Sequence, residues 1–376
     1  MLFVNLKSLI PQSWKSKIKS GVIRPLKRGW DSFLDFIVTE YNYRFRRKEI
    51  QKLLENQRNL PRGLHIEGTN ICNAKCTFCA YPQMERPKQT MPMAQFRQLI
   101  DQYVAMGGKY VSLTPIVGDP FVDRHIFERL DYLNQRPEIQ GFYFYTNAIL
   151  MKPEVSQRLM AYGAKLKVHV SMGGFDRETY KAIMGVDHFD LVRRHIESFI
   201  EIKTKLNSPI HFVISVRCPK SKCTGELWQL IRSNQVKGIL TIEWPYHGFD
   251  SWTGKIKAED LKKVGLEPMR PPYKRGACEL LYMRPVVLAN GKVNACACRD
   301  VEAQLIVGDI NESKLEEVWT GKAIDDLIER HEKGDFPEVC KRCTWYISVY
   351  NQRQSTILQP LLNWSEEDSS ESFRLY

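Results

Sequence analysis

The chain has 376 residues, which is enough for two compact domains or for one large α/β domain with an appendage. Hydrophobic residues make up 43% of it and charged residues 26%, ordinary values for a globular protein that exclude a wholly disordered chain. The net charge of +12 is concentrated near the N-terminus: residues 1–48 contain eleven Lys or Arg against three acidic residues, so the rest of the chain holds only +4.

The ten cysteines are the next feature of the composition. Apolar runs are too short for a membrane-spanning helix, which needs about 20 predominantly apolar residues. Lys7 and Pro11 interrupt the apolar start of the chain, so we expect no secretory signal peptide. We therefore expect a cytoplasmic protein whose cysteines are reduced and bind metal, rather than a disulfide framework.

Residues 1–61 are predicted to form a basic, amphipathic helical extension. Apolar residues recur at four-residue steps from Ile10 to Val22, with lysines between them. Pro25 and Gly29 are expected to break this pattern, and a second apolar face begins at Trp30. Two roles stay open: the apolar face packs on the main domain, or the extension makes a peripheral contact with an anionic membrane.

Residues 62–255 are predicted to form an α/β core in which strands alternate with helices. The predicted strands are short, rich in β-branched or aromatic residues and bounded by turn-forming residues: Leu64–Glu67, Tyr110–Thr114, Phe142–Thr146, Lys167–Ser171, His211–Val216 and Ile239–Glu243. The predicted helices between them include Met93–Ala105, His125–Leu133, Pro153–Tyr162 and Leu191–Thr204. Six such repeats predict a parallel sheet, either a partial barrel or an open doubly wound sheet, with function at the C-terminal strand ends.

Residues 256–350 are predicted to form a small α+β domain, followed by a polar tail over residues 351–376. Val286–Ala289 and Lys292–Cys296 flank an Asn-Gly pair, which is typical of a two-residue hairpin turn. A helix is expected over Lys314–Glu332, before the last two cysteines.

Three cysteines stand directly after the first predicted strand, at Cys72, Cys76 and Cys79. Spacings of three and two residues allow one loop to place three thiolates around a cubane iron–sulfur cluster, leaving one iron open to another ligand. Zinc is the competing interpretation, although a structural zinc site usually has four protein ligands.

The Cys-x3-Cys-x2-Cys motif after a first strand resembles the radical S-adenosylmethionine (SAM) superfamily, whose core is a partial (β/α)6 barrel. The resemblance implies that Cys72, Cys76 and Cys79 hold a 4Fe–4S cluster whose open iron binds SAM. It further implies that reductive cleavage of SAM produces a 5′-deoxyadenosyl radical, with a flavodoxin- or ferredoxin-type protein as electron donor. Phe78 matches the aromatic residue that the family favours before the third cysteine.

Four further residues are assigned to SAM binding by the same resemblance. Gly118 and Asp119 stand where the family usually has Gly-Gly-Glu or Gly-Glu-Pro, and Asp119 is expected to receive the ammonium group of SAM. Asn147 ends the third strand, and Ser171 ends the fourth, where a family serine often bonds the ribose.

The second cysteine set comprises Cys278, Cys296, Cys340 and Cys343, and it supplies enough thiolates to close a second cluster. The arrangement resembles the SPASM/twitch subfamily, specifically the twitch type with a single auxiliary 4Fe–4S cluster. Cys298 is expected not to be a ligand. A zinc ribbon is the alternative for this set.

We therefore expect an oxidoreductase-like enzyme that abstracts a hydrogen atom from a small polar substrate, such as a carbohydrate, while the auxiliary cluster accepts an electron. A peptide-modifying maturase is the close alternative. An alternative of a different class is a zinc-stabilised, non-enzymatic protein at a membrane surface. The core has no basic stripe, so no nucleic-acid partner is expected.

Overall fold

A single nine-stranded sheet runs through the computed structural model, which describes residues 24–59, 61–114, 116–245, 248–296 and 299–355. Its strand order is β6-β5-β4-β3-β2-β1-β7-β8-β9. The first six strands are parallel and comprise β1 (Leu64–Ile66), β2 (Tyr110–Ser112), β3 (Gly141–Thr146), β4 (Leu166–Met172), β5 (His211–Val216) and β6 (Thr241–Glu243). They therefore confirm the predicted parallel core, with strand ends shifted by at most two residues.

The order of the strands decides between the two predicted architectures. From β1 to β6 each strand lies beside the next one in the chain, without the reversal that marks a doubly wound sheet. Strand β1 pairs with β2 and β7 and not with β6, so the curved sheet stays open. The core is therefore a partial (β/α)6 barrel.

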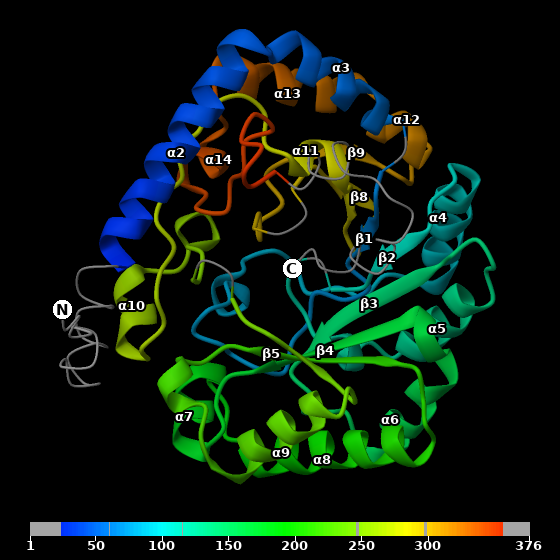
Figure 1. Cartoon of the computed structure of the whole chain (residues 1–376). Helices are drawn as coiled ribbons and strands as arrows, with labels where there is room; N and C mark the ends of the chain where they lie inside the picture. Colours follow the sequence, from blue (N-terminus) through cyan, green and yellow to red (C-terminus); the bar gives the residue numbers. More distant parts are fainter. Residues whose placement is uncertain (1–23, 60, 115, 246–247, 297–298, 356–376) are drawn as a thin grey trace, which may run out of the picture.

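Helices follow the outer face of this sheet (Figure 1). They are α4 (Met93–Ala105), α5 (Ile126–Asn134), α6 (Pro153–Leu159), α7 (Arg177–Met184), α8 (Phe189–Lys205) and α9 (Gly225–Val236). Phe142, Phe144, Val168 and Val170 are fully buried, and the intervening strand residues point to the opposite, concave face. Because those intervening residues include Tyr143, Tyr145 and His169, the concave face is polar and aromatic.

The C-terminal region continues the same sheet through antiparallel strands. Strands β7 (Val286–Val287) and β8 (Lys292–Asn294) form the predicted hairpin, and β9 (Ile306–Asp309) extends it. The helix expected over Lys314–Glu332 is wrong in one respect, because it is two helices, α12 (Leu315–Trp319) and α13 (Lys322–Lys333). Gly321 separates them as the N-cap of α13, and glycine is disfavoured inside a helix. The remaining elements are α10 (Ala258–Lys263), α11 (Leu280–Met283), α14 (Glu338–Arg342) and the 3-10 turns η3 (Tyr81–Gln83), η4 (Pro120–Val122), η5 (Met160–Lys165), η6 (Lys220–Lys222) and η7 (Trp252–Gly254).

Two helices precede the sheet, α2 (Arg24–Phe45) and α3 (Arg47–Arg58). The expected break at Pro25 and Gly29 is wrong, because α2 runs through both. Pro25 lies in the first turn, where its missing N–H costs no hydrogen bond. The amphipathic pattern predicted over residues 10–22 lies outside the described residues.

Helix α3 is part of a second apolar core that it shares with the C-terminal region. Ile50 and Leu54 are buried there against Leu281, Val339 and Tyr350. Figure 1 shows α3 beside α13, above the C-terminal strands. The chain between them builds the whole parallel core. The two ends of the described chain therefore pack against each other although that core separates them in the sequence.

Candidate functional site

The first cysteine loop follows the C-terminal end of β1 and is fastened to the end of α7. The backbone N–H and the hydroxyl of Thr77 both donate to the carbonyl of Ile183, each at 2.9 Å. The N–H of Lys75 donates to the carbonyl of Met184 at 3.1 Å. These bonds hold the segment between Cys72 and Cys79 against the helix.

This attachment depends on Gly185, which sequence reasoning missed. Gly185 ends α7 in the left-handed region, with φ +68°. A Cβ atom at this position would lie 2.2 Å from the carbonyl oxygen of Lys75, which is inside van der Waals contact. A glycine after a helix commonly supplies a C-cap, but its contact with the cysteine loop depends on the path of the chain.

Burial controls the protonation of the three thiols. It raises the pKa of Cys72 to about 12 and that of Cys79 to about 11, and it raises the pKa of Cys76 well above its usual range. Negative charge on neighbouring thiolates and on Asp119 raises the pKa of Cys72 and Cys76 further. Buried thiolates that raise one another's pKa are stable only beside a cation, so the donor set fits a metal cluster.

Asp119 braces the ends of two strands beside this loop. Its Oδ2 accepts hydrogen bonds from the Thr146 hydroxyl at 2.9 Å and from the Asn147 N–H at 2.8 Å, and its Oδ1 accepts from Phe121 N–H at 3.0 Å. Burial raises the pKa of Asp119, and these three donors oppose the rise. Both carboxylate oxygens are therefore engaged within the protein.

Gly118 and Asn147 complete the contact between the strand ends and the cysteine loop. Gly118 has φ +114°, and a Cβ there would meet the carbonyl oxygen of Thr69 at 2.4 Å, so this close approach requires glycine. The side-chain amide of Asn147 lies 3.8 Å from Cys72 Sγ and donates to Asn73 Oδ1 at 2.6 Å. The structure thus brings together Gly118, Asp119 and Asn147 around the first cysteine.

The other two predicted SAM-binding residues have different surroundings. Phe78 packs on Phe249, with ring centroids 5.5 Å apart. Ser171 is half-buried on β4 and pairs in register with Ser215 on β5, and no described contact joins it to the cysteine loop.

Tyr180 on α7 adds an unexpected polar atom to the first site. Its side chain is fully buried, and its hydroxyl has no hydrogen-bond partner among the described residues. Burial raises its pKa, and negative charge on Cys76 and Asp119 raises it further. A buried donor without a partner is costly, so the hydroxyl suits a bound group that accepts a hydrogen bond.

The second cysteine set gathers around the second apolar core. Cys278, Cys296 and Cys340 all pack against it. Burial raises the pKa of Cys278, and the charge of Cys343 raises it further. The Sγ of Cys343 accepts the N–H of Trp345 at 3.3 Å. This donor set therefore also fits a metal cluster, while Cys298 lies outside the described residues.

Lys274 supplies a cation beside these cysteines. Its ammonium donates to the carbonyl of Cys340 at 2.7 Å, and burial lowers its pKa while Cys343, Cys340 and Cys278 oppose that shift. The N–H of Cys278 donates to His331 Nδ1 at 3.4 Å, which leaves the proton of that imidazole on Nε2. This Nε2 is buried without a partner among the described residues.

An ion pair lies between the two cysteine sets. Arg299 Nε is 2.7 Å from Asp250 Oδ2, and the guanidinium stacks between Trp252 and Trp345, 4.9 and 4.5 Å from the ring centroids. Trp252 Nε1 donates to the carbonyl of Phe78 at 2.8 Å. The charge of Arg299 lowers the pKa of Cys79 in the first loop, and the charge of Asp250 raises it.

The same pair acts on the second set. Asp250 raises and Arg299 lowers the pKa of Cys343, next to Trp345. The Asp250–Arg299 pair, flanked by its two tryptophans, is therefore shared by both cysteine sets. Its members are 49 positions apart in the chain, so no local pattern pointed to it.

The concave face of the sheet carries a second unpredicted group of residues. His169 Nδ1 lies 3.1 Å from Glu243 Oε2, which also accepts the hydroxyl of Ser215 at 2.6 Å. Tyr145 stacks on His169 with ring centroids 4.3 Å apart. Burial lowers the pKa of His169 although Glu243 opposes it, so the imidazole is neutral near pH 7 and donates through Nδ1. The sequence signal for this group was polar residues at alternate positions of the strands.

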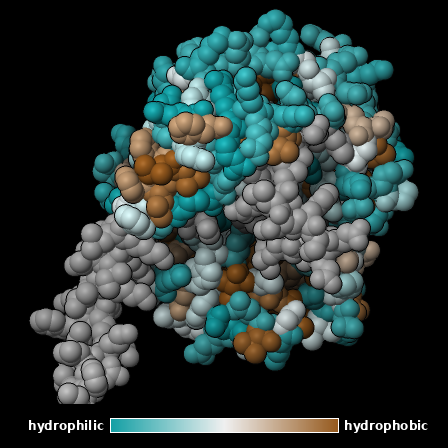
Figure 2. Space-filling view, turned by 45° about the horizontal axis from the view of Figure 1, so that its top comes forward, coloured by the Kyte–Doolittle hydropathy of each residue, from teal (hydrophilic) through white to brown (hydrophobic). Residues whose placement is uncertain are grey.

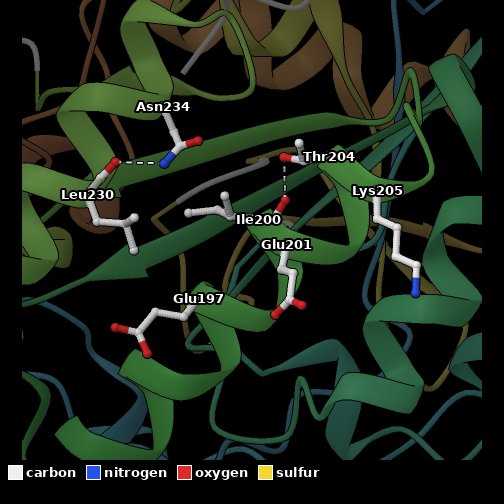
Figure 3. Close-up of a pocket in the computed structure, with 7 residues that line it drawn as sticks. All are labelled: Glu197, Ile200, Glu201, Thr204, Lys205, Leu230 and Asn234. Carbon is white, nitrogen blue, oxygen red and sulfur yellow. Dashed lines mark hydrogen bonds between the residues drawn. The ribbon is translucent and has the colours of Figure 1, made fainter.

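One pocket elsewhere in the described structure carries no site. A shallow pocket between α8 and α9 is lined by Glu197, Ile200 and Asn234, but its Thr204 and Asn234 side chains bond carbonyls of their own helices (Figure 3). Among the described residues, no three His, Cys, Asp or Glu side chains converge on one point as they would around a single metal ion. The ligands of a four-iron cluster bind separate irons and need not converge in that way.

Comparison with known proteins identifies two domains. Residues 66–214 match the radical SAM superfamily, and residues 278–344 match the iron–sulfur cluster-binding domain named SPASM. The chain is 24% identical over 311 residues to a GTP 3′,8-cyclase of Mannheimia succiniciproducens, covering 72% of this chain and 90% of that protein. It is 29% identical over 138 residues to the mycofactocin maturase of Mycolicibacterium smegmatis, covering 37% of this chain and 34% of that protein.

Two solved structures share the fold. SuiB of Streptococcus suis, bound to its precursor peptide SuiA, has a TM-score of 0.55 at 16% identity and covers 82% of this chain and 77% of that one. BtrN, in complex with AdoMet and 2-DOIA, has a TM-score of 0.50 at 15% identity and covers 76% and 93%. A radical SAM domain implies a 4Fe–4S cluster with SAM, and a SPASM domain implies an auxiliary iron–sulfur cluster. The predicted family is thereby confirmed: the chain is an enzyme of the radical SAM superfamily with a C-terminal SPASM domain.

Proposed function

We propose that this enzyme abstracts a hydrogen atom from a small polar substrate bound at the concave face of the sheet. In this proposal Cys72, Cys76 and Cys79 hold the cluster that binds SAM. The auxiliary cluster is held by Cys278, Cys296, Cys340 and Cys343. When bound, the first cluster and SAM together supply the radical that removes a substrate hydrogen.

The observation that carries the substrate class is the polar group on the concave face. Glu243 holds the Nδ1–H of His169 at 3.1 Å, and the stacked ring of Tyr145 fixes the plane of the imidazole. The hydrogen bonds of His169 within the described chain all involve Nδ1. Its Nε2 is then an acceptor for a substrate hydroxyl, which a small polyol or nucleotide ribose offers.

Similarity to the GTP 3′,8-cyclase supports a small polar substrate. That relative is named for a reaction of a nucleotide, and the match covers 90% of its length. The proposal extends to a net dehydrogenation, in which His169 Nε2 accepts the hydroxyl proton and the auxiliary cluster accepts an electron.

An anaerobic substrate panel tests this function. The panel contains ribonucleotides, amino sugars and cysteine- or serine-containing peptides, with dithionite as reductant, and 5′-deoxyadenosine and product masses are measured. A polar small molecule should raise 5′-deoxyadenosine above the uncoupled level. His169→Gln should lose this increase and keep uncoupled cleavage.

His211→Gln is the matched control, because His211 lies on the same face of the sheet as His169 but at the exposed end of β5. This variant should retain the increase. Replacing Cys72, Cys76 and Cys79 by alanine should abolish cleavage altogether and lower iron from about eight to about four atoms per chain. Cleavage by that triple variant, or one or two zinc ions without sulfide in the wild type, would contradict the proposal.

A peptide substrate is the second candidate. The mycofactocin maturase matches over 138 residues at 29% identity, which favours peptide modification without covering most of either chain. If only peptides raise 5′-deoxyadenosine in the panel, this candidate replaces the first. His169→Gln then retains full activity if the imidazole does not contact the substrate.

A further inference from the structure

The outer face of α2 carries an apolar stripe that nothing in the described structure covers. Trp30, Phe33, Ile37, Tyr41 and Phe45 have exposed fractions of 61%, 52%, 45%, 56% and 74%. Their spacing of three or four residues puts all five on one side of the helix. Trp30 contacts Phe33 and Tyr41 contacts Phe45, at ring-centroid distances of 5.8 and 5.3 Å, so the stripe packs mainly with itself.

The stripe holds half of the large apolar side chains that are exposed in the described structure. Figure 2 shows hydrophobic surface gathered on the side of the molecule where α2 lies. Soluble proteins rarely leave such a contiguous patch without a partner. Its occupant can be inferred from the charges around it.

Every acidic residue of α2 is paired with an arginine from the body of the protein. Asp31 and Asp35 contact Arg353 at 3.2 and 3.3 Å. Glu40 accepts from Arg275 at 2.7 Å, and its side chain is only 10% exposed. The outer side of the helix is therefore left without unpaired negative charge.

Positive charge lies near the same helix. Arg44, which pairs with Glu40 at 2.9 Å, is exposed in the last turn of α2, and Lys48 is exposed in the first turn of α3. The sequence before α2 contains Lys7, Lys15, Lys17 and Lys19 and has no acidic residue. An apolar stripe rich in Trp, Tyr and Phe beside a segment with an excess of basic residues has the chemistry of a helix that lies in the interface of an anionic bilayer.

We propose that α2 docks this enzyme on an anionic lipid surface, with Trp30, Phe33, Ile37, Tyr41 and Phe45 inserted between the headgroups. The 22 residues of α2 form a rod of about 33 Å, which lies along the surface. None of the described helices has the length and hydropathy to cross a membrane. Docking is thus peripheral. This inference stands apart from the substrate proposed above.

Vesicle sedimentation of the full-length, cluster-loaded protein tests the docking. Phosphatidylglycerol-containing vesicles should pellet the protein, whereas pure phosphatidylcholine should pellet much less, and added salt should weaken the binding. The variant with Trp30, Phe33 and Ile37 each changed to Ser should lose at least about tenfold in affinity for the anionic vesicles. Brominated lipids should quench tryptophan fluorescence in the wild type, and less so in Trp30→Ser.

The matched control changes Leu206 and Val236 to Ser. These two residues are 47% and 84% exposed, at the ends of the outer helices α8 and α9. It should bind vesicles as the wild type does. Uncoupled cleavage of SAM in solution should stay the same in all variants, which shows that they fold and hold their clusters. Equal vesicle binding by the stripe variant and the wild type would overturn the proposal. So would a wild-type dimer in light scattering that the stripe variant abolishes, because the stripe then serves a second copy.

Discussion

At the scale of single residues, two glycines decide how closely the cysteine loop is enclosed. Gly118 admits the carbonyl of Thr69 and Gly185 admits that of Lys75, and both have positive φ. Gly118 could be found from a motif, whereas Gly185 follows a helix like any ordinary C-cap. The difference is that the need for glycine at 185 comes from a segment more than one hundred residues away.

Gly185→Ala should lower the iron content of the first site and the thermal stability of the protein, because the new Cβ meets the Lys75 carbonyl at 2.2 Å. The control is Gly238→Ala. Gly238 has φ +74°, close to the +68° of Gly185, but no atom lies within 4 Å of its Cβ position. Both variants share the cost of about 1 kcal/mol for a left-handed alanine.

Iron analysis and thermal unfolding measure the difference. Gly185→Ala should be less stable than Gly238→Ala by roughly 2 kcal/mol or more. Equal iron content and equal stability of the two variants would show that the loop does not depend on this close approach.

At the scale of elements, a small clamp joins the core to the C-terminal domain. Trp252 in η7 bonds the carbonyl of Phe78 in the first loop, while Arg299 links Trp252 to Trp345 just after α14. The Asp250–Arg299 pair is 8% and 17% exposed, so its charges are poorly screened and act on both cysteine sets. A change to this clamp should therefore be felt at both proposed clusters.

Arg299→Met should make the reduction potentials of both clusters more negative, by roughly 20–60 mV, because it removes a positive charge that favours the reduced state. Asp250→Asn should move both potentials in the opposite direction. Redox titration followed by electron paramagnetic resonance measures the shifts, and iron content shows whether the clusters are retained.

The control for this clamp is Arg232→Met. Arg232 also stacks on a tryptophan, with its Cζ atom 5.9 Å from the ring centroid of Trp228, but it lies on the outer helix α9. It should leave both potentials unchanged. Shifts of the same sign in Arg299→Met and Asp250→Asn would mean that the pair acts through packing and not through charge.

At the scale of the whole molecule, one sheet passes from the radical SAM core into the SPASM region, because β7 pairs in parallel with β1. Buried histidines occur along this sheet. Burial lowers the pKa of His65 on β1 and of His169 on β4. These residues link the stability of the sheet to pH.

The free energy of unfolding should fall as the pH is lowered below 6.5, the ordinary histidine pKa. The folded state keeps His65 and His169 neutral, while the unfolded state binds protons, so stability present above pH 6.5 is lost as the pH falls toward the lowered pKa values. Each histidine contributes up to about 1.4 kcal/mol per pH unit in this window.

Urea denaturation between about pH 7.5 and about pH 5.5 measures this dependence. His65→Gln, which removes one buried imidazole, should flatten the decline. A decline that is equally steep in the variant would show that His65 does not contribute.

The sequence by itself determined the six parallel strands, the C-terminal hairpin, both cysteine sets and the family to which they point. These features depend on local patterns: apolar periodicity reports burial, Asn-Gly reports a tight turn, and thiol spacing reports a ligand loop. Strand β5 and the helix Met93–Ala105 match their predicted bounds because each has a strong pattern and clear breakers.

Only the tertiary structure decided the partial barrel, the close approach at Gly185, the Asp250–Arg299 clamp and the pairing of His169 with Glu243. It also showed that α2 runs through Pro25 and Gly29 and leaves an apolar stripe uncovered. The physical reason is that periodicity records which side of an element is apolar, and not what lies against that side. Contacts between residues 49 to 110 positions apart depend on the path of the whole chain, which no local pattern contains.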